Sequence, residues 1–174
     1  MRRVRYCVAA SLDGFIADPD GGYDWIVMDD AIDFASIFEE FDTFVMGRKT
    51  WEVSAPPDAP TMFGDKEVIV FSTKLKSTSR PSVRIVNTPP ADTVRELKQK
   101  PGKDIWLFGG GAMFRTLVDA DLVDTVEIAI MPVLLSQGIP VLAPGARMTG
   151  LKLDKCETLP KSGIVMLSYT MPHT

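Results

Sequence analysis

The chain has 174 residues, of which 45% are hydrophobic and 24% charged. This balance is typical of a single globular domain with a buried core, and it excludes a disordered chain. The formal net charge is −4, so no basic surface of the kind that nucleic acids require is expected. The apolar runs are short and interrupted, which argues against a membrane span.

The number and positions of cysteine and histidine residues argue against several kinds of functional site. Cys7 and Cys156 are far apart and form no CxxC pair, so we expect two reduced thiols rather than a disulfide or a metal site. The only histidine, His173, is next to the last residue, which argues against a histidine-ligated zinc ion or a Ser-His-Asp triad. The N-terminus lacks a secretory signal, so a cytoplasmic location is expected.

Helical and strand-like patterns alternate in the first two thirds of the chain, and strands alone finish it. Apolar runs predict strands at 4–10, 15–17, 44–46, 67–71, 83–86, 105–108 and 123–131, and a closing hairpin at 151–158 and 164–171. Amphipathic spacing predicts helices at 31–41, 93–100 and 113–118, and one more begins after Gly47. We expect Asp29 and Asp30 to cap the first helix, a loop at 55–60, and an edge strand that bends at Pro132.

This order of elements predicts an α/β fold for residues 1–174 as one domain. A mostly parallel central sheet would be flanked by helices, with an antiparallel hairpin at the C-terminal end.

Three consecutive glycines follow the apolar run 105–108 and precede a helical pattern. Glycines remove every Cβ at a point where something must approach the main chain, and the free N–H groups at a helix start favour a phosphate. The alternative is a tight turn that only packs a strand on a helix.

A second strand, glycine and helix-start unit spans 44–52 and contains Arg48, Lys49 and Thr50. Two cations and a hydroxyl suit a phosphate, unless they are ordinary surface residues. The unit is not a Walker loop, because Asp42 stands where that motif requires a glycine. Ser72, Thr73 and Lys74 add two hydroxyls and a cation at the end of the next strand.

Ligands of open α/β sheets collect at the carboxyl ends of the strands. If the strands are parallel, the segments 11–14, 47–50, 72–74 and 109–111 share that edge. Two anion subsites there would suit the pyrophosphate and the extra monophosphate of NADPH. The usual dinucleotide fingerprint is absent, since Phe114 stands where a small residue is required.

Three further residues are candidates for chemistry close to a substrate. Asp13 would orient the substrate or relay a proton, or would only cap its own turn through an Asx bond. Asp33 is the second choice, although an acidic residue early in a helix usually just complements the dipole. Trp25 would either form a ligand wall or plug the edge of the core.

The motif Val45-Met46-Gly47-Arg48-Lys49-Thr50-Trp51-Glu52 resembles the cofactor motif of dihydrofolate reductases, and 108–114 resembles their second glycine motif. The segments 11–17, 24–25 and 131–138 are more similar to the reductase domain of the bifunctional riboflavin-biosynthesis deaminase-reductase. These motifs occur in order over nearly the whole chain.

The resemblance implies a dihydrofolate-reductase-like fold, NADPH as cofactor, a small-molecule substrate and a homodimer. The expected cofactor-binding residues are Ala9, Ile16, Ala17, Gly47, Arg48, Lys49, Thr50, Phe71, Ser72, Thr73, Lys74, Phe108, Gly109, Gly110, Gly111, Ala112 and Met113. The expected substrate-binding residues are Ser11, Trp25, Asp29, Asp30, Trp51 and Ala129, with Asp13 and Asp33 as catalytic candidates.

Departures from the folate-reductase pattern concern the substrate. Ala129 replaces a threonine, Phe114 replaces a tyrosine, and the arginine that binds the glutamyl tail of folate has no clear counterpart. We therefore expect an NADPH-dependent reductase of a pyrimidine- or pterin-like substrate, resembling 5-amino-6-(5-phosphoribosylamino)uracil reductase. A dihydrofolate reductase and a non-catalytic nucleotide-binding paralogue are the alternatives.

Overall fold

The structure is a computed structural model that describes residues 1–55 and 62–173. Most of the predicted loop at 55–60 therefore lies outside the described residues. Within the described part of the chain, no helix has both the length and the apolar character needed to cross a bilayer.

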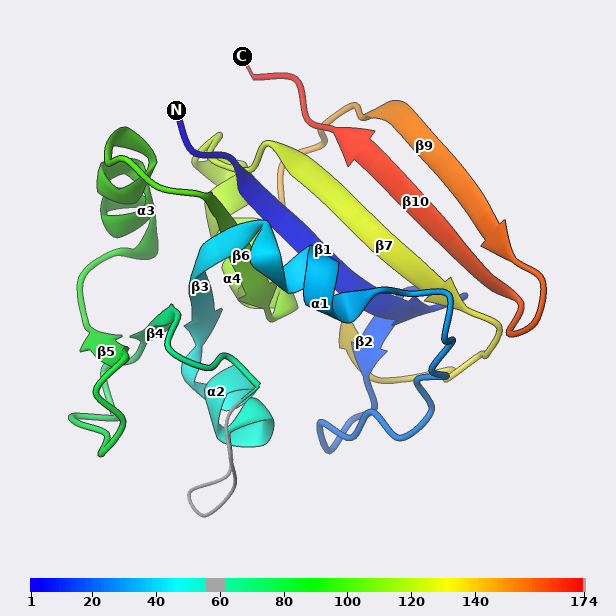
Figure 1. Cartoon of the computed structure of the whole chain (residues 1–174), viewed down its shortest axis with the longest axis horizontal. Helices are drawn as coiled ribbons and strands as arrows, with labels where there is room; N and C mark the ends of the chain where they lie inside the picture. Colours follow the sequence, from blue (N-terminus) through cyan, green and yellow to red (C-terminus); the bar gives the residue numbers. More distant parts are fainter. Residues whose placement is uncertain (56–61, 174) are drawn as a thin grey trace.

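One eight-stranded sheet runs through the molecule in the order β5-β4-β3-β6-β1-β7-β10-β9 (Figure 1). The first six strands in this order are mutually parallel, and β10 and β9 continue the sheet antiparallel. The strands are β1 (Val4–Ser11), β3 (Phe41–Gly47), β4 (Glu67–Phe71), β5 (Val83–Val86), β6 (Asp104–Gly109), β7 (Thr125–Met131), β9 (Lys152–Leu159) and β10 (Ile164–Thr170). The predicted α/β fold and its C-terminal hairpin are confirmed.

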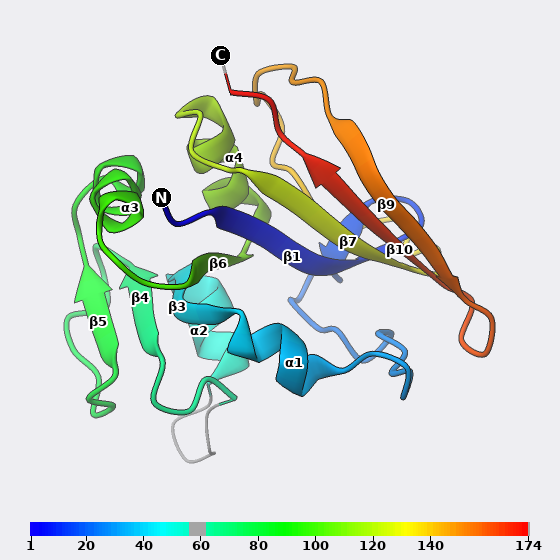
Figure 2. The ribbon, with the colours of Figure 1, turned by 45° about the horizontal axis from the view of Figure 1, so that its top comes forward.

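Helices cover both faces of the sheet (Figure 2). On one face lie α3 (Pro90–Gln99) and α4 (Gly111–Asp119), whose apolar sides pack on buried residues of the sheet. The Tyr6 ring of β1 stacks on the Phe114 ring of α4, with 3.8 Å between the ring centroids. On the other face lie α1 (Phe34–Glu39) and α2 (Arg48–Ser54), over an aromatic cluster centred on Trp106. Both faces are thus buried, which explains why the parallel strands read as continuous apolar runs.

The first helix is shorter than predicted. α1 begins at Phe34, and its N-cap is Asp33, whose Oδ1 accepts a hydrogen bond from the Ser36 N–H at 3.1 Å. The prediction that Asp29 and Asp30 cap this helix is wrong, because the aspartate three residues before Ser36 satisfies the free N–H group instead. Phe41, predicted as the last helical residue, is the first residue of β3 and is fully buried.

Pro132 does not bend an edge strand, as the sequence suggested. β7 ends at Met131 and is paired on both sides, with β1 and with β10. Proline has no N–H to donate to a ladder, so the chain leaves the sheet there. It then forms β8 (Ile139–Pro140), which pairs antiparallel with β2 (Phe15–Ala17) in a separate two-stranded sheet.

This small sheet passes directly over the start of α4. The Ala143 N–H donates to the Gly111 carbonyl at 3.2 Å, and a Cβ built on Gly111 would lie 2.2 Å from the Pro140 carbonyl oxygen. A side chain cannot fit at that distance, so Gly111 lets two backbones approach each other.

We predict that Gly111→Ala destabilises the protein by about 1–3 kcal/mol, because the added methyl must push β8 away from α4. The free energy of unfolding from urea titration measures this effect. Gly150→Ala is the matched control, since its added Cβ meets no atom within 4 Å and its stability should stay within about 0.5 kcal/mol of wild type. Equal stability of the two variants would contradict the packing described here.

Candidate functional site

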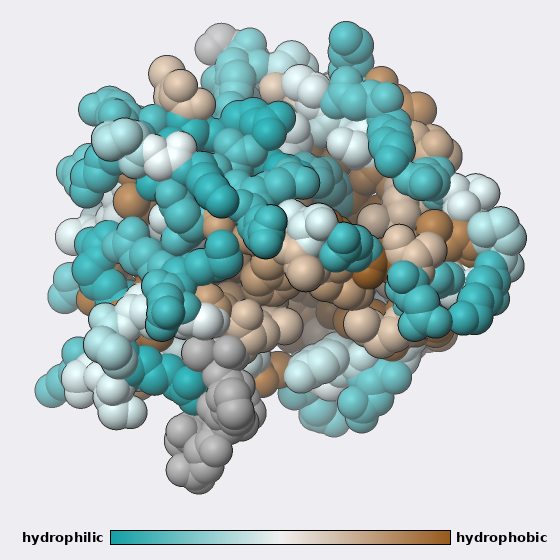
Figure 3. All heavy atoms as spheres, viewed as in Figure 1, coloured by the Kyte–Doolittle hydropathy of each residue, from teal (hydrophilic) through white to brown (hydrophobic). Residues whose placement is uncertain are grey.

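A cavity of about 2140 Å³ opens at the carboxyl ends of β1, β3, β4 and β6. Ligand pockets usually measure about 300–1,000 Å³, so this one has room for two ligands side by side. Figure 3 shows it as a hollow with hydrophobic walls, surrounded by hydrophilic residues. We call the part of its wall formed by α2, the segment 71–74 and the start of α4 the outer arm, and the part formed by α1 and the strands β1, β6, β7 and β10 the inner arm.

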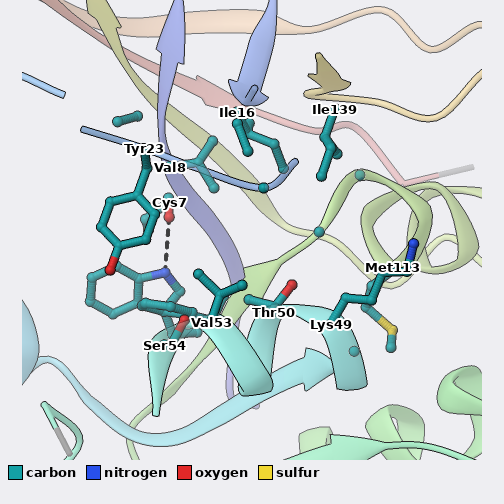
Figure 4. A pocket seen from close by; sticks show the side chains of 18 of the residues that line it. Cys7, Val8, Ile16, Tyr23, Lys49, Thr50, Val53, Ser54, Met113 and Ile139 are labelled. Carbon is teal, nitrogen blue, oxygen red and sulfur yellow. Dashed lines mark hydrogen bonds between the residues drawn. The ribbon is translucent and has the colours of Figure 1, made fainter. Parts of the chain in front are cut away.

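Both predicted glycine turns lie along the outer arm. A Cβ built on Gly110 would be 3.5 Å from Thr50 Oγ1 and 3.7 Å from Ile16 Cδ1, so the two turns and β2 meet at one place. Figure 4 shows Lys49 and Thr50 on the first turn of α2, across the cavity from Ile16 and Ile139. A Cβ on Gly47 would meet no atom within 4 Å, which leaves its backbone open to the cavity.

Cations and hydroxyls line the far end of the outer arm. Arg48 donates from Nη1 to both carboxylate oxygens of Glu52 at 2.6 Å, so its charge is partly used within α2. Lys49 and Lys74 form no ion pair with any described residue, and both line the cavity. The Ser72 Oγ accepts the N–H groups of Lys74 and Leu75 at 3.1 and 2.8 Å, which folds this segment into a tight turn at the cavity wall.

The start of α4 presents backbone donors to the same arm. Its N-cap, Gly110, provides no side-chain hydrogen bond, so no side chain caps the first N–H groups of this nine-residue helix. Gly110 through Met113 line the cavity, as does Phe108 at the end of β6. Gly109 is buried and does not line it; its φ of 132° is a backbone conformation that favours glycine.

The inner arm is apolar except at one point. Its walls include Phe38 from α1, Trp106 from β6 and Met166 from β10. The Trp106 Nε1 donates to the Cys7 carbonyl at 3.0 Å, which fixes the indole against β1 (Figure 4). The exception is Glu127, a carboxylate on β7 directly opposite Cys7 in the strand register.

Arg5 holds the Glu127 carboxylate in place. Its Nε and Nη2 donate to Oε1 and Oε2, both at 2.7 Å, and the Thr125 hydroxyl donates to Oε1 at 2.8 Å. Burial by itself would raise the pKa of Glu127, but the hydrogen bonds and charge of Arg5 outweigh burial and lower the pKa below its usual value. Glu127 is therefore ionised at neutral pH.

The structure places Asp13 outside the cavity. Its carboxylate accepts the N–H groups of Leu135 and Ser136 at 3.1 and 2.7 Å, and so anchors the loop between β7 and β8. The nearby Ser11 hydroxyl and these two N–H groups lower the pKa of Asp13, which disfavours it as a proton donor. Ser11 is buried beside it and accepts the Phe15 N–H at 2.9 Å rather than lining the cavity.

The other predicted aspartates also lie away from the cavity walls. Asp33 caps α1, and the Ser36 hydroxyl and N–H lower its pKa. Asp29 is buried and accepts the Ala31 N–H at 2.9 Å, while Asp30 is exposed and accepts a hydrogen bond from Lys161 at 3.1 Å.

The predicted tryptophans pack on hydrophobic clusters and do not line the cavity. Trp51 is buried in the aromatic cluster beside Phe63, and Trp25 packs on the cluster around Met131 and Ile164. The small residues, in contrast, do line the cavity: Ala9 and Ala129 are register partners on β1 and β7, and Ala17 lies on β2. Phe71, Ser72 and Thr73 line the outer arm as well.

Several cavity residues were not predicted from the sequence. They include Cys7, Trp106, Glu127, Met166, Asn87 and Thr88. In β7, Glu127 alternates with apolar residues, a pattern that is also typical of a strand with one face in water. Only the neighbouring Arg5, in the same face of β1, could have signalled that this carboxylate is enclosed.

The fold and the cavity define the class of protein: an α/β protein with a large ligand site at the carboxyl edge of a parallel sheet. The chain belongs to the RibD C-terminal domain family, whose profile matches residues 2–165.

Known proteins similar to this chain agree with that membership. The uncharacterized protein YyaP of Bacillus subtilis is 31% identical, with 97% of this chain and 94% of YyaP covered. A putative riboflavin biosynthesis protein from Shewanella sp. PV-4 has a similar structure, with a TM-score of 0.80 and 27% identity over 99% of this chain and all of that one.

A third structure shows the same fold at lower identity. It is the diaminohydroxyphosphoribosylaminopyrimidine deaminase/5-amino-6-(5-phosphoribosylamino)uracil reductase of Thermotoga maritima, with a TM-score of 0.72 and 17% identity. The match covers 98% of this chain and 57% of that one.

Proposed function

We propose that this protein is an NADPH-dependent reductase that transfers hydride to a pyrimidine- or pterin-like substrate. The observation that carries the proposal is a single cavity with two unlike arms. The outer arm has glycines, cations and hydroxyls, and the inner arm is apolar with one carboxylate. Ala9 and Ala129 are register partners that line the cavity, and their small side chains leave room for two flat rings to meet.

The residues of the outer arm fit a phosphorylated dinucleotide. Gly47 leaves its backbone open, the first N–H groups of α4 have no side-chain cap, and Lys49 and Lys74 have unpaired charges within the described structure. When bound, the nicotinamide group would supply hydride. The protein residues would hold the phosphates, orient the two rings and keep water out.

The names of similar proteins support the substrate class. One is described as a riboflavin biosynthesis protein and another as a uracil reductase. Phe114, which replaces the folate-reductase tyrosine, stacks on Tyr6 in the core and does not line the cavity, and Asp33 caps α1 instead of facing a pterin. These positions argue against dihydrofolate as the substrate.

The proposal includes a cytoplasmic homodimer. The edge strand β9 supports the homodimer, because its residues Lys152 to Thr158 are exposed in the single chain. An exposed edge strand that carries apolar residues such as Leu153 is a surface that proteins usually cover.

We predict a preference for NADPH over NADH that depends on the two unpaired lysines. Lys49→Ala with Lys74→Ala should weaken NADPH binding by about 2 kcal/mol, roughly 30-fold, and NADH binding much less, because only NADPH has the additional phosphate. Fluorescence titration measures both affinities. Arg95→Ala with Lys100→Ala removes the same charge at α3, outside the cavity, and should change neither. Equal losses for both cofactors in the first variant would contradict this assignment.

We further predict that Gly47→Ala separates folding from binding. The added methyl meets no atom within 4 Å, so the free energy of unfolding should change by less than about 1 kcal/mol. The same methyl would extend into the cavity and should weaken NADPH binding about tenfold or more. Calorimetric titration together with urea unfolding tests both parts, and unchanged affinity would show that no ligand approaches Gly47.

Substrate turnover tests the reaction itself. We expect NADPH oxidation, followed by absorbance, with 5-amino-6-(5-phosphoribosylamino)uracil and none with dihydrofolate. Turnover of dihydrofolate that antifolates inhibit would favour a folate reductase. NADPH binding without oxidation of either substrate would favour a non-catalytic nucleotide-binding protein.

A further inference from the structure

We propose that Glu127 selects the substrate, by accepting hydrogen bonds from a ring N–H group and the adjacent amino group of a flat heterocycle in the inner arm. This inference rests on the proposed reductase function and names the residue and the substrate chemistry that the function requires.

The strand register gives Glu127 its position. Thr125, Glu127, Ala129 and Met131 alternate along β7 and share one face, and Glu127 is opposite Cys7 as Ala129 is opposite Ala9. Two residues along a strand span about 7 Å, roughly the width of an aromatic ring. A ring that occupies the inner arm beside Ala129 would therefore have its far edge at the Glu127 carboxylate.

The Glu127 carboxylate can accept hydrogen bonds from a ligand by exchanging its weakest donor. Oε1 already accepts from Arg5 Nε and the Thr125 hydroxyl, whereas Oε2 accepts from Arg5 Nη2. The Cys7 thiol is a fourth donor, and its hydrogen bond contributes to the lowered pKa of Glu127. A thiol is a weak donor, so an N–H group of a ligand in the cavity can displace it from the carboxylate. The Glu127 side chain is 26% exposed and lines the cavity, while that of Arg5 is only 9% exposed. A ligand in the arm therefore meets the carboxylate and not the guanidinium.

The charges around Arg5 decide which ligands this end of the cavity accepts. Arg5 is shared between Glu127 and Glu40, and it lies 3.5 Å from Asp104, which pairs with Arg3 at 2.6 Å. Two cations therefore face three carboxylates. Burial raises the pKa of the neighbouring Cys7 thiol, and the Glu127 charge adds to the shift, so the thiol stays neutral. A phosphate would be repelled here, and N–H donors are favoured.

The walls define the shape of the ligand. Trp106, Phe38 and Met166 form apolar surfaces on which a flat ring can stack. A ring with adjacent N–H groups, such as an aminopyrimidine, fits both the walls and the carboxylate. Any phosphate attached to that ring would point outward, away from Glu127.

Glu40 provides a matched control, because it also pairs with Arg5 but does not line the cavity. If Glu127 acted only by neutralising Arg5, the variants Glu127→Gln and Glu40→Gln should behave alike. If Glu127 contacts the ligand, only its own substitution should change ligand binding.

The test is calorimetric titration of two probes. In 5,6-diaminouracil the ring N1–H lies next to the 6-amino group, whereas its 1,3-dimethyl derivative keeps the amino groups but lacks both ring N–H groups. We expect the wild-type protein to bind diaminouracil about tenfold or more tightly than the dimethyl compound. Glu127→Gln should weaken diaminouracil binding by about tenfold and abolish this preference, and Glu40→Gln should do neither. The wild-type comparison needs no variant, so it remains informative if Glu127→Gln does not fold.

Three results would overturn the inference: a wild-type protein that does not distinguish the probes or binds neither, a Glu127→Gln protein that keeps the preference, or equal losses in the two variants. NADPH titration of the same proteins is the separate readout for the proposed function. Wild-type protein that binds NADPH but fails the probe test would contradict the role of Glu127 alone, whereas absence of NADPH binding would contradict the proposed function.

Discussion

Parallel pairing among β1, β6, β3 and β4 determines which loops of this protein can meet. Because these strands run in the same direction, the segments that follow them emerge at one edge of the sheet. The turn at Gly47, the segment 72–74 and the turn at Gly110 are far apart in sequence but line the same cavity for this reason. The antiparallel strands β10 and β9 extend the sheet beside β7, and Met166 of β10 forms part of the inner wall.

The charge distribution along the cavity favours one orientation of two bound ligands. Lys49 and Lys74 line the outer arm, and Glu127 lines the inner arm. Phosphates and N–H donors are therefore attracted to opposite ends. Close backbone approach also shapes the site, since the small β2–β8 sheet lies against Gly111 at the start of α4. Backbone packing and charge together determine where a dinucleotide and a heterocycle would bind in the cavity.

Periodicity and turn chemistry were sufficient to predict the sheet, its hairpin and the shared edge, because buried parallel strands and glycine turns have strong local signals. These signals were insufficient to predict the roles of side chains that depend on tertiary contacts. Asp33 rather than Asp29 caps α1 because only its carboxylate reaches the Ser36 N–H, and Asp13 anchors a loop formed more than 120 residues later. Glu127 resembles a solvent-facing residue until Arg5 and α1 enclose it. Trp25 could be a ligand wall or a core plug on sequence grounds, and it packs against a hydrophobic cluster. Trp51, expected to bind substrate, is buried in the aromatic cluster instead.

The most direct test of the central claim is a crystal structure of the protein with NADP⁺ bound. The account predicts phosphate density beside Gly47, Lys49 and the first turn of α4, with the nicotinamide ring next to Ala9 and Ala129 and the inner arm free for a second ring. Density for the cofactor at another surface, or a nicotinamide ring that fills the inner arm against Glu127, would contradict it.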